Sequence, residues 1–375
     1  DAPPQMTPAL IFTTLFYLYF LLMPLLAGLI RRLRETPEGI FLLAVNAFYS
    51  FLCYSLILFG SHRAALGYVA LGQALPVLLL FHVWTKRQPG DRSTADCLLF
   101  IAMSLVTIAV PIHLRFNTVA VAWAAEGCAL LYLGVRNRRA VVHFGGYIVL
   151  FLSAVALFQR LPLHARPFDP VFNAPFGSWM FVIAAFILGA FFLLRGKKER
   201  RDGLMPGLLI VSGFILFCLL ATMETFYYWE INRRGLSDGE THLFSTLVVL
   251  WSLISSATLF VILRNKWMQW LPLPLICYAV AGLIFLLGFM EYDIKSSDLA
   301  LNAVFLPRLA FILAILWGGQ RLKRGGFEIP GVFFGVTGQM LLTLLMTVEM
   351  VRWVDRTDLV SDRMGLSLIS ALWAV

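Results

Sequence analysis

Long apolar runs, separated by short polar segments, recur along the whole chain. Each run holds about 20 residues, enough for a helix rising ~1.5 Å per residue to cross a ~30 Å hydrocarbon layer. The runs lack the alternation of barrel strands, and a backbone facing lipid must satisfy its own hydrogen bonds, so helices are expected. The pattern therefore predicts an all-α polytopic transmembrane bundle. About 13 spans, the last one incomplete, are expected near residues 9–30, 40–60, 64–85, 97–114, 118–135, 141–158, 176–194, 204–228, 243–263, 271–290, 299–320, 329–351 and 366–375.

The composition agrees with lipid as the surrounding solvent. Hydrophobic residues make up 60% of the chain, charged residues only 14%, and the mean hydropathy is +0.81. In a soluble domain about a quarter of all residues are charged, so this chain has too few charged residues to cover a surface that faces water. We expect a single transmembrane domain, residues 1–375, with membrane lipids as its partners. Because the chain starts at Asp1 and stops at Val375 inside an apolar run, we also expect a piece of a longer protein.

The formal charge of +9 is interpreted as a signal of membrane orientation rather than of nucleic-acid binding. Of the 30 lysines and arginines, 19 lie in every second loop, as in the Arg136-Asn137-Arg138-Arg139 cluster. Cytoplasmic loops carry such an excess of positive charge, which predicts an extracytoplasmic N-terminus. The five cysteines lie in or beside apolar runs without metal-ligand spacing, so neither a metal nor a cofactor is expected.

Two of the apolar runs share polar positions. Each begins with Pro-Gly, at Pro206 and Pro330, and each ends with Thr-x-Glu, at Glu224 and Glu349. The prolines are 124 residues apart and the glutamates 125, so the register nearly holds. Polar residues at fixed spacing are a stronger sign of repetition than recurring leucine and valine. We interpret the two runs as copies of one membrane helix.

The repeat extends beyond this helix. Asn173-Ala174 returns as Asn302-Ala303 after 129 residues, and the segment Gly134–Arg138 resembles Ile262–Lys266. The unit is then four helices, about 125 residues long. An even number of spans preserves helix direction, which predicts parallel repeats rather than the inverted repeats of many transporters.

The stretch Ala122-Trp123-Ala124-Ala125-Glu126-Gly127-Cys128-Ala129-Leu130-Leu131-Tyr132-Leu133-Gly134 resembles a known family. It is similar to the W-A-x-E-x-x-A-L-x-x-L-G helices of the bacterial family called domain of unknown function 2339, and Ser367–Trp373 resembles another piece of it. The resemblance implies a many-helix protein of the bacterial inner membrane. It implies no established activity and no catalytic residues.

Charged residues within the spans are the strongest pointers to function, because an ionised group at mid-bilayer costs several kcal/mol unless it is paired or hydrated. Glu126 and Arg308 each lie about two turns into a span, at similar depth and with opposite sign. An ion pair between them is a structural hypothesis. A substrate or proton site, and snorkelling to the headgroups, are the alternatives. Trp123 shares a helix face with Glu126.

A second group of polar residues is expected at the outer interface. Glu224 and Glu349 lie roughly 27 Å along their helices from the prolines at the inner side. They either satisfy helix ends or line an outward-facing cavity. His113, Arg115 and Glu291 end spans on the same side, and they form either a polar vestibule or an ordinary interface.

These residues leave three function hypotheses open. In the first, the repeats bind or translocate a cell-envelope lipid or lipid-linked glycan. In the second, the protein is an intramembrane transferase at the outer face, with Glu224, Glu349, His113 or Glu291 as general base. In the third, it is a non-catalytic membrane scaffold. The chain contains no HExxH, paired CxxC, GxSxG or phosphate-binding glycine loop that would identify an enzyme class.

Overall fold

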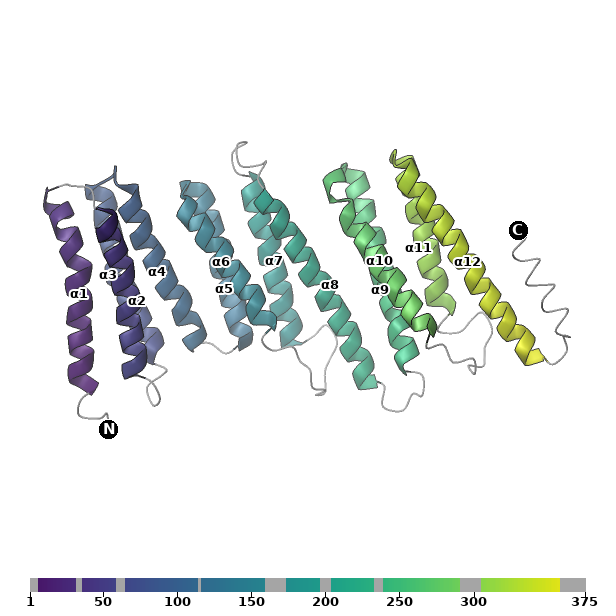
Figure 1. Cartoon of the computed structure of the whole chain (residues 1–375), viewed down its shortest axis with the longest axis horizontal. Helices are drawn as coiled ribbons and strands as arrows, with labels where there is room; N and C mark the ends of the chain where they lie inside the picture. Colours follow the sequence, from purple (N-terminus) through teal and green to yellow (C-terminus); the bar gives the residue numbers. More distant parts are fainter. Residues whose placement is uncertain are drawn as a thin grey trace. The chain divides into compact units, whose positions relative to one another are not determined.

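In the computed structural model of the protein, the described residues are 6–31, 36–58, 65–113, 116–158, 173–195, 204–232, 239–290 and 305–357. Their regular structure is helical throughout, which confirms the all-α class (Figure 1). The helices are α1 Met6–Arg31, α2 Pro37–Ile57, α3 Ala65–Arg87, α4 Arg92–His113, α5 Phe116–Asn137, α6 Ala140–Phe158, α7 Ala174–Arg195, α8 Leu204–Asn232, α9 Gly239–Asn265, α10 Pro272–Met290, α11 Phe305–Arg324 and α12 Glu328–Thr357, with a short 3₁₀ turn at Met268–Trp270.

Eleven of these twelve helices are long and apolar enough to cross a membrane. The exception is α11, which carries Arg308 in its first half and three basic residues in its last turn. The first residues of the span expected there, 299–304, lie outside the described residues, as does the whole thirteenth span at 366–375. The polytopic architecture is confirmed, and the number of thirteen spans stays a prediction.

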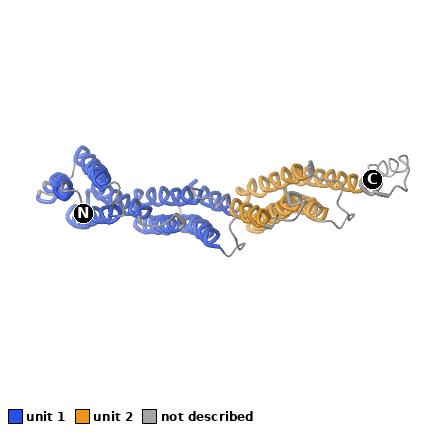
Figure 2. Tube along the Cα trace, turned by 90° about the horizontal axis from the view of Figure 1, so that it is seen from below, with its two compact units in different colours: residues 1–163, 172–217 blue, residues 164–171, 218–375 orange. Residues whose placement is uncertain are grey.

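The chain divides into two compact units (Figure 2). Unit 1 consists of residues 1–163 and 172–217, and unit 2 of residues 164–171 and 218–375, so the boundary falls within α8. In unit 1, α1 packs on α2, α3 on α4, and α5 on both α6 and α7. In unit 2, α9 packs on both α10 and α11, and α11 packs on α12. Helices adjacent in sequence thus form most of the packed pairs.

Polar side chains start several of the helices. The Asp91 carboxylate accepts hydrogen bonds from the backbone N–H of Thr94 at 3.3 Å and from its hydroxyl at 2.7 Å. The Asn173 side chain accepts from the N–H of Phe176 at 2.7 Å, and Thr36 accepts from Gly39. Such caps satisfy N–H groups of the first turn, which have no partner within the helix. They explain why α4 begins five residues before its expected span.

Three helices end in a left-handed residue. Arg138 follows α5 with φ 55°, Lys266 follows α9 with φ 58°, and Gly326 follows α11 with φ 88°. In each case the next N–H bonds the carbonyl five residues earlier, at 3.2, 3.0 and 2.9 Å. This is the Schellman arrangement, which satisfies carbonyls of the last turn and reverses the chain within a few residues.

Glycines allow close approach within two of the helical hairpins. A Cβ on Gly127 of α5 would lie 3.0 Å from the carbonyl of Gly146 in α6, and a Cβ on Gly146 would lie 3.0 Å from the carbonyl of Gly127. In the α11–α12 hairpin, a Cβ on Gly319 would lie 3.0 Å from the carbonyl oxygen of Gly331, and a Cβ on Gly331 would lie 2.9 Å from that of Gly319. Small residues let backbones meet in membranes, where van der Waals packing replaces the hydrophobic driving force.

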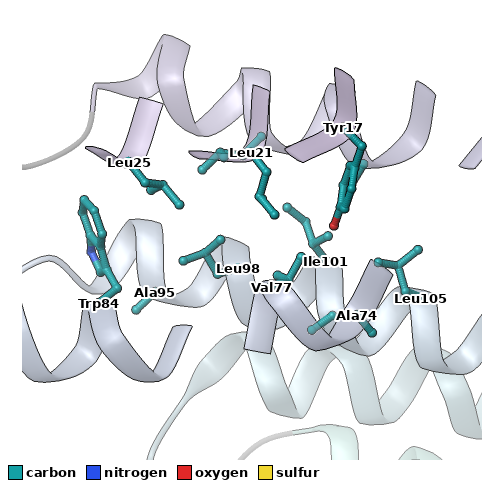
Figure 3. Packing of buried hydrophobic residues seen from close by; sticks show 13 residues of the cluster. Tyr17, Leu21, Leu25, Ala74, Val77, Trp84, Ala95, Leu98, Ile101 and Leu105 are labelled. Atoms are coloured by element: carbon teal, nitrogen blue, oxygen red, sulfur yellow. The ribbon is translucent and has the colours of Figure 1, made fainter. Parts of the chain in front are cut away.

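Each unit has its own packed interior. In unit 1 one cluster joins α1, α2, α3 and α4 around Leu21, Leu25 and Trp84 (Figure 3). In unit 2 another joins α9 to α12 around Phe285 and Phe311. Large side chains such as Phe48 remain 72% exposed, as expected for a surface that faces lipid rather than water.

Two glycines of α12 provide a matched test of the hairpin. We expect Gly331→Ala to lower the free energy of unfolding by about 1–3 kcal/mol, because the new Cβ meets the α11 backbone at 2.9 Å. Gly335 has nothing within 4 Å of such a Cβ, so Gly335→Ala should raise the free energy of unfolding by up to about 1 kcal/mol through helix propensity. Denaturation in lipid–detergent micelles measures both. Equal effects of the two variants would contradict the hairpin geometry.

Candidate functional site

A buried arginine and a buried glutamate lie in the interior of unit 2. Arg308 of α11 is 4% exposed and Glu349 of α12 is 6% exposed. The Arg308 guanidinium donates a 2.7 Å hydrogen bond to the carbonyl of Gly288 in α10, and it stands 5.8 Å from the centre of the Phe285 ring. The negative charge of Glu349 acts on this guanidinium. The two charged side chains therefore connect three helices through one buried arginine.

An apolar groove of about 830 Å³ lies between α10, α11 and α12, and Phe285, which faces Arg308, is one of its lining residues. Its floor includes Phe311 and Ile315, and Thr337 and the Tyr278 hydroxyl are the polar groups along it. The Tyr278 hydroxyl is already engaged, at 2.8 Å from Ser256 and 3.2 Å from the carbonyl of Ala314. The residues along its walls are Leu275, Tyr278, Ala279, Gly282, Leu283, Phe285, Leu286, Ile329, Pro330, Phe333, Phe334, Thr337 and Leu341.

The groove is open along its length. Leu283 is 58% exposed, Phe333 68% and Ile329 84%, so its rims face the surroundings of the helices. Phe285 and Phe311 both line it, and their rings stand 5.4 Å apart. The groove can hold a long apolar chain, and it offers no side chain suited to catalysis.

Glu126 lies in a different polar cluster, within unit 1. Its Oε1 is 2.7 Å from the hydroxyl of Thr107 in α4. The indole N–H of Trp123, one turn earlier in α5, donates to the backbone carbonyl of Thr107 at 2.9 Å. Glu126 is half-buried, and its Oε2 is covered without a hydrogen-bond partner among the described residues. Trp123 and Glu126 do share a face, and both are directed to one threonine.

The expected pair of Glu126 and Arg308 stays a prediction. Glu126 belongs to unit 1 and Arg308 to unit 2. Within its own unit, Arg308 already has the Gly288 carbonyl and the charge of Glu349.

The two repeated glutamates have different surroundings. Glu224 in α8 is half-buried and its charge acts on Tyr227, one turn later. Glu349 in α12 is deeply buried near Arg308. The threonine before Glu224, Thr222, accepts a 3.1 Å hydrogen bond from the indole of Trp251 in α9. Neither an outer cavity nor helix-end satisfaction by these two carboxylates is tested by these contacts.

The remaining candidates of the outer face lie largely outside the described residues. Arg115 and Glu291 belong to that part of the chain, and His113 is described only as the last residue of α4. The polar vestibule therefore stays a prediction. Among the described residues no group of three or more His, Cys, Asp or Glu side chains could hold a metal ion.

Uncharged polar residues near the midpoints of α1, α2 and α3 were not predicted as partners from the sequence. Asn46 donates to the carbonyl of Tyr17 at 3.0 Å, Gln73 donates to the hydroxyl of Ser50 at 2.9 Å, and the Tyr17 hydroxyl donates to the carbonyl of Gln73 at 2.9 Å. These bonds join α1, α2 and α3 near their midpoints. The signal was present, because Asn and Gln in the middle of a span are as informative as charges.

Comparison with known proteins identifies the family. Residues 2–375 match the family described as "Predicted membrane protein (DUF2339)". The chain therefore belongs to this family, which confirms the resemblance carried by the Trp123–Glu126 helix and extends it over nearly the whole sequence. No curated protein and no solved structure matches the chain.

A double-mutant cycle tests the buried pair in unit 2. We expect Arg308→Met or Glu349→Gln alone to lower the free energy of unfolding by about 3–5 kcal/mol, because each leaves an uncompensated buried partner. The double variant should lose less than the sum, by at least about 0.5 kcal/mol of coupling. Arg324→Met, an exposed change in the same helix, is the control and should stay within about 0.5 kcal/mol of the parent. Additive losses would show that the two charges do not interact.

Proposed function

We propose that this DUF2339 membrane protein binds a lipid, with an acyl chain in the groove of α10, α11 and α12 and an anionic headgroup at its basic end. The observation that carries the proposal is the groove itself: about 830 Å³ of apolar space, open along its length and lined by three helices. Ligand sites in helical membrane proteins lie between helices in this way.

The length of the groove suits one leaflet. Its walls run from Leu275 to Leu286 in α10 and from Ile329 to Leu341 in α12, or roughly 17 Å along each helix at ~1.5 Å per residue. That is about half of the ~30 Å hydrocarbon thickness. A single chain from one leaflet fits this span, which favours lipid binding over a path across the membrane.

Basic residues stand at the end of the groove where α11 ends and α12 begins. Arg321, Lys323 and Arg324 are exposed there, and the Lys323 side chain lies against Gly331 in the first turn of α12. Lysine and arginine near a membrane surface contribute about 1 kcal/mol each to the attraction of anionic lipid. Since surrounding lipid tails are as apolar as the groove, this basic end supplies most of the selectivity.

The same basic end supports an orientation of the chain in the membrane. Under the positive-inside rule, Arg321, Lys323 and Arg324 lie at the cytoplasm, which puts the N-terminus outside the cytoplasm of a bacterial inner membrane. The groove then belongs to the inner leaflet. A phospholipid and a lipid-linked glycan share the chemistry that this site recognises, a phosphate attached to a long apolar chain.

We also retain the parallel four-helix repeats and a thirteenth span as part of this proposal. The helices packed most closely on α5 are α6 and α7, and those on α9 are α10 and α11, which is the same pattern four helices later. The indole of Trp123 donates to the backbone carbonyl of Thr107 in the preceding helix, and that of Trp251 donates to the hydroxyl of Thr222 in the preceding helix. Arg138 and Lys266, which correspond in the sequence, both adopt left-handed backbone geometry. These three agreements support the repeat.

Photo-crosslinking tests lipid binding. The probe is phosphatidylglycerol with a diazirine in one acyl chain, in vesicles containing the full chain. We expect crosslinks in the peptides of α10 and α12, and a loss of at least fivefold in Thr337→Phe, which fills the groove. Val336→Phe is the matched control, because Val336 is 55% exposed and lies outside the groove lining. Equal crosslinking in both variants would remove the groove as the site.

A second experiment distinguishes a phospholipid from a polyprenyl phosphate as the bound lipid. Replacing Arg321, Lys323 and Arg324 by glutamine should reduce the preference for phosphatidylglycerol over phosphatidylcholine by about fivefold per charge, from ~1 kcal/mol each. Unlabelled phospholipid and unlabelled undecaprenyl phosphate are then compared as competitors. Stronger competition by the polyprenyl phosphate would assign the site to a lipid-linked glycan carrier.

A further inference from the structure

We propose that Glu126 is a proton-binding site in unit 1: its carboxyl group is protonated in the structure and donates its hydrogen to Thr107. This site is independent of the lipid groove, which is formed by other helices. The proposal goes beyond the lipid function because it assigns a second ligand, the proton, to a different cluster of residues.

The hydroxyl of Thr107 carries one hydrogen and has two oxygen neighbours. Its Oγ lies 2.9 Å from the carbonyl of Met103 and 2.7 Å from Oε1 of Glu126. A carboxylate and a carbonyl both only accept hydrogen bonds. If Glu126 were ionised, the two acceptors would compete for one hydrogen. If Glu126 carries a proton, Thr107 donates to Met103 and accepts from Glu126, and both short distances are satisfied.

Other threonines show where the Thr107 hydrogen goes. Thr13, Thr222 and Thr347 each donate to the carbonyl four residues earlier, at 2.8, 2.8 and 2.7 Å. This local bond is the usual one for a threonine inside a helix. The bond from Thr107 to Met103 follows the same pattern, which leaves the proton in the second contact to come from the glutamic acid.

The surroundings of Glu126 disfavour a negative charge. Its Oε2 is covered and has no hydrogen-bond partner among the described residues, and the indole of Trp123 donates to a backbone carbonyl instead of the carboxyl group. The ion pair of this unit that the structure describes joins Arg139 to Asp96 and leaves Glu126 out. An unpaired carboxylate within a span costs several kcal/mol, and a group in this position binds a proton instead.

The helices around Glu126 carry few titratable groups near its level. The helices packed against α5 are α4, α6 and α7. Near the level of Glu126, Gly127 meets Leu150 and Gly146 of α6, and Tyr147 is the titratable residue in that stretch. The others on these helices are Arg92, Asp96, Cys97 and His113 of α4, His143 of α6 and Arg195 of α7, with Cys128, Tyr132 and Arg136 on α5 itself.

Arg92, Arg136 and His143 lie far along the helices from the contact of Glu126 with Thr107. Arg92 is fifteen residues before Thr107 in α4, or about 22 Å by helical rise. Arg136 lies ten residues beyond Glu126, or about 15 Å by helical rise. His143 lies opposite Gly134 of α5. Gly134 is eight residues beyond Glu126, which is about 12 Å along the helix. Asp96, one of the acidic members, is paired with Arg139.

Infrared difference spectroscopy tests the protonation directly. The full chain in vesicles should show the C=O stretch of a protonated carboxylic acid that shifts in D₂O and declines as the pH rises, with the carboxylate bands growing in its place. Glu126→Gln should remove this band and keep the melting temperature, because the glutamine amide can donate to Thr107 in the same way. Thr107→Val should leave the band but shift its frequency, since the hydrogen-bond acceptor is lost.

Chemical labelling provides an independent readout. With dicyclohexylcarbodiimide, the acid proton moves to one nitrogen, the carboxyl oxygen bonds to the central carbon, and the adduct rearranges to a stable N-acylurea without oxidation or reduction. We expect labelling of the peptide with Glu126 that falls as the pH rises. A water-soluble carbodiimide should label it poorly. A spectrum without the acid band in the parent, or a band unchanged by Glu126→Gln, would overturn the proposal.

Discussion

The absence of water from the hydrocarbon layer is the constraint on which this structure depends. A polar group in a membrane span must find its partner within the protein, because lipid tails offer none. Helices satisfy the backbone, and side chains such as Thr36 and Asp91 satisfy the N–H groups at helix starts. Polar side chains inside the spans obey the same rule. Their partners therefore show which helices must stay together.

The few polar contacts between helices have a disproportionate effect on the architecture of each unit. In unit 2, Arg308 holds α11 to α10 through the carbonyl of Gly288 and faces the charge of Glu349 in α12. In unit 1, Thr107 connects α4 to Trp123 and Glu126 of α5. Association in lipid has no hydrophobic driving force, so packing at glycines and a small number of such bonds must stabilise the units. The polar residues that hold the helices together are therefore the same ones that are candidates for function.

The helices were predictable from the sequence because their signal is local. An apolar run of membrane length identifies eleven of the twelve described helices, all but α11, and the family resemblance rested on residues such as Trp123 and Glu126. Helix ends were harder to predict, since polar residues extend α8 to Asn232 and α12 to Thr357 beyond their apolar runs.

The partners of the buried groups were not predictable in this way. Glu126 contacts Thr107, and Arg308 donates to the carbonyl of Gly288. Both contacts depend on which helices are neighbours and on how each helix is rotated about its own axis. Hydropathy carries no information about either. Asn46 and Gln73 were missed for another reason. They carry no formal charge, so a search for charged residues does not find them, although their side chains also need hydrogen-bond partners in lipid.

The reversals after α5 and α9 use arginine and lysine where glycine would adopt the left-handed backbone more easily. Arg138 and Lys266 accept a conformation that is unfavourable for a residue with a side chain. In return, each puts a fixed positive charge beside the partial negative charge of a helix C-terminus. A positive charge near a membrane surface attracts anionic lipid, so we expect these turns to anchor the helices at a fixed depth in the bilayer. A membrane with fewer anionic lipids would loosen that vertical position without breaking any contact inside the protein.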